Sequence, residues 1–119
     1  MGTLAIAACH RGDDPAAGIS VREQITPQPV RVGPANVIVQ LADAAAAEPI
    51  PHATIMVEAD MSHPGMGPVF GTAKETAPGS YRTQIDFNMG GDWIVLLHIK
   101  LADGRKIERH MDVRSVRSN

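Results

Sequence analysis

Aliphatic and polar residues alternate along most of this chain, and that period of two limits the fold more than any other feature. Ile19, Val21 and Ile25 alternate with polar residues, and the same pattern returns at Ala53–Ala59 and at Tyr81–Phe87. Alternation of this kind is typical of a β-strand with one buried face, and no segment shows the 3.6-residue period of a helix. The chain is therefore predicted to be all-β.

Proline and glycine divide the alternating segments into about seven short strands. Pro78-Gly79 predicts a turn, and Asp103-Gly104 is the strongest hairpin signal in the chain. The segment 42–51 is small and polar with two prolines, which predicts either a long connection or an irregular edge. The predicted strands cover residues 19–25, 36–41, 53–59, 69–75, 81–87, 93–101 and 105–113. Seven antiparallel strands in about 100 residues favour an immunoglobulin-like β-sandwich.

Composition narrows the classes of protein that this chain can belong to. A length of 119 residues predicts one domain, and a net charge of −2 lacks the basic footprint of a nucleic-acid binder. With only four aromatic residues, the core must be aliphatic, and Trp93 is expected at its centre. A single Cys excludes an internal disulfide and any CxxC motif. No Ser/His/Asp or Cys/His arrangement is suggested, so we do not expect an enzyme.

The amino-terminal segment resembles the processing site of bacterial lipoproteins. Ile6-Ala7-Ala8-Cys9 has the small side chains that a lipoprotein peptidase needs before the Cys, whose thiol would carry the lipid. Only Met1-Gly2-Thr3 precedes the apolar run, without a positive region. Residues 1–18 are therefore either a truncated lipoprotein signal followed by a flexible tether, or a frayed tail with an inert Cys. In the first case a lipid on Cys9 would be the chain's link to the membrane, since no stretch reaches the roughly 18 apolar residues of a span.

One loop concentrates soft metal donors. Residues 61–66 read Met-Ser-His-Pro-Gly-Met, which places Met61, His63 and Met66 in a segment broken by Pro and Gly. Thioether sulfur binds Cu(I) well, and imidazole accepts either copper oxidation state. Met89, next to Gly90-Gly91, is a further donor. The loop therefore predicts a copper site, or else a plug in which the two Met side chains cap one end of the sandwich.

The remaining His and Met residues are weaker candidates. His52 precedes the strand that leads into the loop, and Met56 is out of phase with the core face, so it could support a surface site. His98 is out of phase with Trp93 and is interpreted as a hydrogen-bonded residue on the sheet surface. His110 and Met111 must point to opposite faces of the last strand, and Met111 is in phase with the core.

The layout from Val32 onward resembles the YtkA-like domain family, which is related to FixH-like proteins. The resemblance rests on an ordered series of motifs across about four-fifths of the chain. They are Pro29-Val30-Arg31-Val32-Gly33-Pro34-Ala35-Asn36, Leu41 with Asp43-Ala44, Ala53–Val57, the Met61–Met66 loop, Pro78-Gly79-x-Tyr81, Phe87-x-Met89-x-Gly91-x-Trp93 and the Asp103-Gly104 hairpin.

This resemblance implies an extracytoplasmic immunoglobulin-like sandwich, often lipid-anchored, that takes part in copper handling or cytochrome oxidase maturation. Carried to this chain, it implies Met61, His63, Met66 and Met89 as the metal-binding residues of the domain 19–117. We therefore expect a copper carrier, buffer or accessory protein in the periplasm or on the cell surface, with an envelope protein as its partner. The alternative is a module without metal, whose Met loop is a contact surface in an envelope complex.

Overall fold

The computed structural model describes residues 17–62 and 67–118, and these residues form seven strands. The strands and turns account for the described part of the chain, which contains no helix and therefore no helix able to cross a membrane. The bounds are β1 Ile19–Thr26, β2 Gly33–Asp43, β3 Thr54–Met61, β4 Val69–Ala77, β5 Ser80–Phe87, β6 Gly91–Lys100 and β7 Lys106–Val116.

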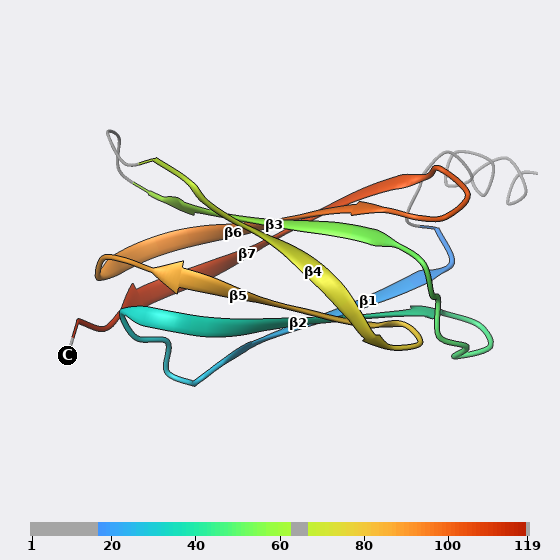
Figure 1. The fold of residues 1–119 in the computed structure, drawn as a ribbon, viewed down its shortest axis with the longest axis horizontal. Helices are drawn as coiled ribbons and strands as arrows, with labels where there is room; N and C mark the ends of the chain where they lie inside the picture. Colours follow the sequence, from blue (N-terminus) through green and yellow to red (C-terminus); the bar gives the residue numbers. More distant parts are fainter. Residues whose placement is uncertain (1–16, 63–66, 119) are drawn as a thin grey trace, which may run out of the picture.

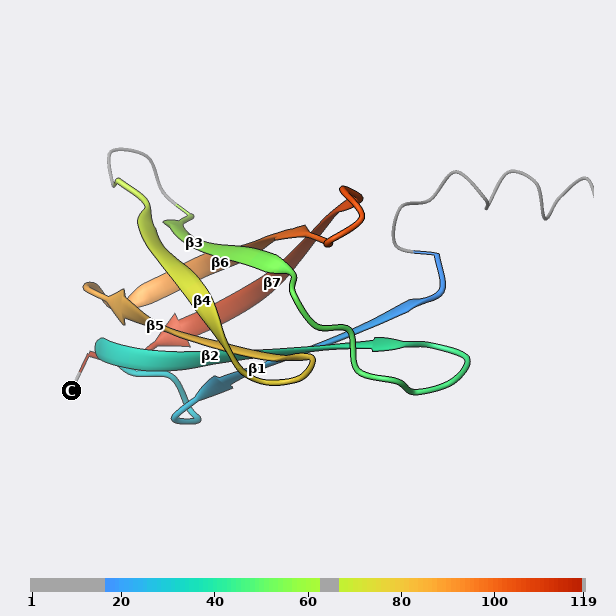
Figure 2. The same ribbon diagram turned by 45° about the vertical axis from the view of Figure 1, so that its right-hand side comes forward.

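All neighbouring strands pair antiparallel, in the order β1-β2-β5-β4-β3-β6-β7. The sheet curls into two layers, with β1, β2 and β5 in one and β3, β6 and β7 in the other (Figure 1). β4 belongs to both, since its residues 69–73 pair with β3 and its residues 74–77 pair with β5. Figure 2 shows β4 passing from one layer to the other. The prediction of an immunoglobulin-like β-sandwich with seven antiparallel strands is confirmed.

A short parallel contact joins the two layers on the side opposite β4. Between β1 and β2 the chain runs beside the end of β7, and the Val32 N–H donates to the Arg117 carbonyl at 2.7 Å. The Arg117 N–H in turn donates to the Val30 carbonyl at 3.0 Å. Because these bonds engage the segments beyond β1 and at the end of β7, the sandwich is held together on both sides.

The alternating residues of the two layers meet in an aliphatic core. Trp93 lies within it and meets Phe87 edge to face, with ring centroids 5.1 Å apart. Among residues 17–62 and 67–118, twenty-two hydrophobic residues are buried and no polar or charged residue is, as expected where strands bury one face. The fully buried residues include Val37, Val39, Ile55, Val57, Ile85, Val95 and Leu97. The sequence prediction of an aliphatic core around Trp93 is confirmed.

Several strands are longer than the alternation indicates. β2 begins at Gly33 rather than residue 36, because Gly33 pairs with Phe87 of β5. β7 continues to Val116, which pairs with Gly91 across an irregular register. The segment after Asp43 is a connection that folds back along β2, where the Ile50 N–H donates to the Leu41 carbonyl at 3.0 Å.

Tyr81 fixes that connection to the sandwich. Its ring is fully buried, and its hydroxyl donates to the Ile50 carbonyl at 2.8 Å and accepts from the Ala53 N–H at 3.0 Å. Burial raises the pKa of the Tyr81 hydroxyl above its usual value. The turn at Gly79 abuts the same segment, since a Cβ at that left-handed position would lie 2.7 Å from the Pro49 Cβ. The Pro78-Gly79 turn predicted from the sequence therefore packs against Pro49 of the β2–β3 connection.

Replacing Tyr81 by Phe keeps the buried ring and removes only the hydroxyl. We expect Tyr81→Phe to lower the free energy of unfolding by about 1–3 kcal/mol, because a backbone donor and a backbone acceptor lose their partner. Urea denaturation measures this change. The adjacent Ser80→Ala variant is the control and should stay within about 0.5 kcal/mol of the wild type. Equal stability of the two variants would contradict the role of the hydroxyl.

Candidate functional site

Two of the four predicted copper ligands lie at the same end of the sandwich. Met61 is the last residue of β3 and pairs with Trp93 of β6, while Met89 lies in the turn between β5 and β6. The Ser62 N–H donates to the Asp92 carbonyl at 3.1 Å, which ties the end of β3 to the β5–β6 turn. Met61 and Met89 are 28 positions apart in sequence, and the fold brings them to the same end of the sandwich.

Side-chain hydrogen bonds hold the β5–β6 turn and the start of β6. The Trp93 indole N–H donates to the Met89 carbonyl in the turn at 3.0 Å, and the Asp92 carboxylate in β6 accepts from the Ser115 N–H of β7 at 2.8 Å. Gly91 has a φ of +121°, a conformation that favours glycine. A Cβ at Gly91 would lie 3.4 Å from the Met61 methyl carbon, so the Met61 side chain reaches the turn. The turn therefore presents the Met89 side chain, which is 41% exposed.

Met61 faces inward and is only 8% exposed. This is the placement that the plug alternative expects for Met61, whereas Met89 has the exposure expected of a surface ligand. His63, Met66 and Cys9 lie outside the described residues. Within residues 17–62 and 67–118, no group of three His, Cys, Asp or Glu side chains is arranged to hold a metal ion.

The weaker candidates lie elsewhere. His52 precedes β3, at the opposite end from Met61, where its N–H donates to a Glu75 carboxylate oxygen at 3.1 Å. Met56 points outward from β3 and is 44% exposed, as its phase predicts. Met111 is partly buried and packs against the core, again as predicted. His52 thus lies away from the Met61–Met89 end, and Met56 points to the opposite face of β3 from Met61.

His98 is the centre of a charged network on the outer surface of β3, β6 and β7. Its Nδ1 lies 2.8 Å from a Glu108 oxygen and its Nε2 lies 3.0 Å from a Glu58 oxygen. These hydrogen bonds, that with Glu108 foremost, raise the pKa of His98 above 6.5. Burial and the neighbouring Glu58 raise the pKa of the Asp60 carboxyl. The prediction of a hydrogen-bonded surface histidine is confirmed, while its two carboxylate partners were not identified from the sequence.

Apolar side chains lie beside this network. Phe70 is 56% exposed and pairs with Glu58, and Ile94 is 37% exposed and pairs with Asp60. Met56 pairs with both Thr72 and His98. A shallow hollow of about 380 Å³ is lined by Met56, Phe70, Gly71 and Thr72. This surface therefore combines exposed apolar groups with charged ones.

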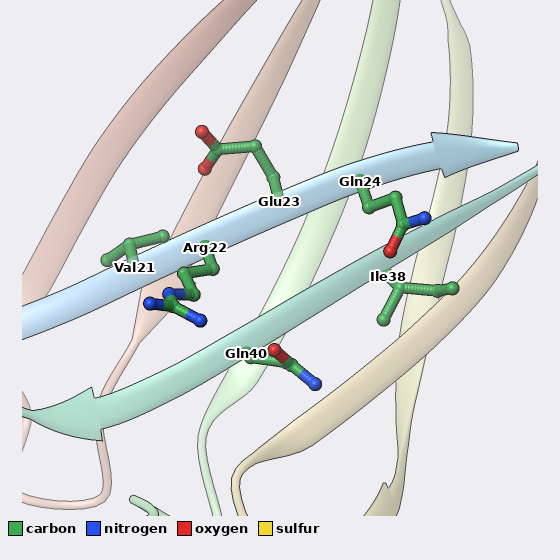
Figure 3. Close-up of a pocket in the computed structure, with 6 residues that line it drawn as sticks. All are labelled: Val21, Arg22, Glu23, Gln24, Ile38 and Gln40. Carbon is green, nitrogen blue, oxygen red and sulfur yellow. The ribbon is translucent and has the colours of Figure 1, made fainter. Parts of the chain in front are cut away.

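The opposite layer carries a hollow of a different character. It measures about 500 Å³ and lies over β1 and β2 (Figure 3). Arg22 pairs with Gln40, and Gln24 pairs with Ile38, so these four side chains share the outer face. Figure 3 shows Glu23 pointing away from Gln40. The hollow is open and mixed in polarity, and it brings together no pair of catalytic or metal-binding groups.

Comparisons with known proteins relate the chain to one family. Residues 18–98, more than half of the chain, match the model of the YtkA-like family. No curated protein matches the chain. Among solved structures, a structure of murine CRIg aligns with a TM-score of 0.44 and 10% sequence identity, covering 85% of this chain and 98% of that one. The family match runs from the start of β1 into β6, and it includes both Met61 and Met89.

The raised pKa of His98 predicts a pH dependence of stability. A histidine whose pKa is higher in the folded state contributes stability that is fully present below its unfolded pKa of about 6.5. That contribution is lost as the pH rises through the folded pKa. The raised pKa of Asp60 also makes the free energy of unfolding fall as the pH rises, over a more acidic pH range that begins near 3.8. We therefore expect the free energy of unfolding to fall between pH 6 and pH 9.

Urea denaturation at several pH values measures that slope. His98→Gln should flatten it, since the titrating ring is gone while a hydrogen-bonding side chain remains. His110, on β7, also points outward, so His110→Gln is the control and should keep the wild-type slope. If His98→Gln and the wild type lose stability in parallel from pH 6 to pH 9, the Glu58–His98–Glu108 network does not couple to folding.

Proposed function

Since the chain belongs to the YtkA-like family, we propose that it is an extracytoplasmic copper-binding domain. Its β-sandwich would carry or buffer copper rather than catalyse a reaction. The observation that carries this proposal is the placement of Met61 and Met89 at one end of the fold, linked by the bond from Ser62 to Asp92. The exposed Met89 residue lies in a turn whose backbone accepts a hydrogen bond from the Trp93 indole.

The chemistry of these side chains suits Cu(I). Thioethers are soft, uncharged donors, and they select Cu(I) over the harder divalent ions. Met89 would supply one sulfur, and His63 and Met66 the imidazole and a second sulfur. Met61 would join the site by turning its flexible side chain past Gly91, which has no side chain of its own to block it. The copper would then pass to or from a protein partner in the cell envelope.

We further propose that Cys9 carries a lipid and that this lipid is the chain's membrane anchor. When the protein is expressed from its own gene in bacteria fed radiolabelled palmitate, the wild type should incorporate label and move with the membrane fraction. Cys9→Ser should lose both the label and the membrane association. Retention of the label in Cys9→Ser would show that the resemblance to a lipoprotein processing site is fortuitous.

Titration with Cu(I) against a competing chelator tests the metal site. We expect one Cu(I) per chain, and an affinity at least about tenfold weaker in Met89→Leu. Leu keeps the apolar volume of Met and removes the sulfur, and such exchanges cost less than about 1.5 kcal/mol of stability. The variant Met61→Leu with Met66→Leu should weaken binding at least as much as Met89→Leu.

Met56→Leu is the matched control, since Met56 is as exposed as Met89 but points outward from the sheet face. It should bind Cu(I) like the wild type. If Met89→Leu and the double variant both bind as tightly as Met56→Leu, the site assignment is wrong. If only Met61→Leu, made alone, leaves the affinity unchanged, Met61 is a plug beside a site formed by the other three residues.

A further inference from the structure

The outer face of β4, β3, β6 and β7 carries exposed apolar side chains among charged ones. A cross-strand row is a set of residues that pair with one another across neighbouring strands. We define this outer face as the outward-pointing residues of four such rows. The two middle rows are Phe70, Glu58, Leu96 and His110, and then Thr72, Met56, His98 and Glu108. Exposed apolar patches that are bordered by polar groups are typical of protein–protein contact surfaces.

The two end rows of the outer face have opposite charge. At the end near Met61, Asp60 and Asp112 both pair with Ile94, and Arg114 lies 3.9 Å from an Asp112 carboxylate oxygen. At the other end, Lys100 of β6 pairs with Lys106 of β7 and with Thr54 of β3. The charges between these rows are partly matched, since His98 bonds to both Glu58 and Glu108. The face is thus more acidic at one end and basic at the other, and the two rows between them combine apolar side chains with the His98 network.

From this pattern we infer that the outer face is the contact surface of a homodimer, in which a second copy stacks face to face with its strands reversed. The two-fold axis lies between the copies and runs across the strands, midway between the two middle rows. This symmetry operation exchanges the end rows, so that Lys106 of each copy opposes Asp112 of the other and Lys100 lies between Asp60 and Asp112. A two-fold contact of this kind is self-complementary.

The same symmetry places the two middle rows against each other. His110 of one copy opposes Glu108 of the other, while Leu96 opposes His98 and Glu58 opposes Met56. Phe70 comes to lie over Thr72, at the hollow that Met56, Phe70, Gly71 and Thr72 line. An aromatic side chain entering an apolar hollow is the kind of anchor that contributes most to binding.

The size of the face predicts a weak association. Four strands about 4.8 Å apart and seven residues at about 3.3 Å each give a footprint of roughly 400 Å² on each copy. This is below the roughly 800 Å² per partner of a standard interface. We therefore expect a dissociation constant between about 10 µM and 1 mM, which weakens as salt screens the end rows.

Sedimentation velocity on the metal-free protein, from about 20 µM to 2 mM, measures the association. Two charge-reversed variants break it in complementary ways. Lys100→Glu with Lys106→Glu gives a face that is acidic at both ends, and Asp60→Lys with Asp112→Lys gives one that is basic at both ends. Each variant alone should dimerise at least about tenfold more weakly than the wild type, because like charges then oppose each other.

An equimolar mixture of the two variants should restore dimerisation to the wild-type level. In the mixed dimer the new Glu residues of one copy meet the new Lys residues of the other, and the unaltered Asp row meets the unaltered Lys row. Arg22→Glu with Arg82→Glu, which makes the same charge change on the other layer, should dimerise like the wild type. Circular dichroism confirms that each variant is folded before it is compared.

Three outcomes would overturn the inference. They are a wild type that stays monomeric at about 2 mM, a mixture no more associated than its components, or an Arg22/Arg82 control as weak as the Lys variant. In the last case net charge governs association, and not the outer face. Because the protein is free of metal throughout, these results are independent of whether the Met61–Met89 end binds copper.

Discussion

The division of β4 between two partners determines the shape of the whole domain. Its first residues bond to β3 and its last residues bond to β5, so one ladder of hydrogen bonds continues from layer to layer. Because β4 must cross, the two layers cannot flatten into one open sheet. The aliphatic faces of β2, β5, β3 and β6 are consequently turned toward each other. The parallel contact of Val30 and Val32 with Arg117 then joins the layers on the other side.

Alternation in the sequence was sufficient to predict most of this arrangement. The residues on one phase of each predicted strand, such as Val37, Val57 and Leu97, are the buried ones. Trp93 is central because it is the largest side chain on the inward phase of the most apolar strand. The crossing of β4 could not be predicted in the same way, because it depends on which strands β4 meets and not on the pattern within Val69–Ala77.

The surface network around His98 shows where sequence reasoning stops. A two-residue turn at Asp103-Gly104 would pair His98 with Arg109, which lies on the other phase of β7. In the structure the loop has three residues, 102–104, because the Leu101 N–H donates to the Arg105 carbonyl, and Gly104 has a positive φ. The strand pairing is therefore shifted by one residue from that of a two-residue turn, and Lys100 pairs with Lys106. His98 therefore meets Glu108. A shift of one residue exchanges the two faces of a strand, so surface pairs need the observed register.

Of the candidate copper ligands, the sequence identified the residue types, while the fold brought Met89 beside the end of β3.

The direction of β1 has a consequence for how the domain is oriented in its surroundings. Ile19, the first residue of β1, pairs with Asp43 at the end of β2, and this end also holds the start of β3. Met61 closes the other end of β3, about 23 Å away at 3.3 Å per residue. For a chain attached to a membrane through the residues before β1, the attachment and the methionine end are at opposite poles. In such a chain Met89 would lie at the end of the domain farther from the point where the tether joins β1.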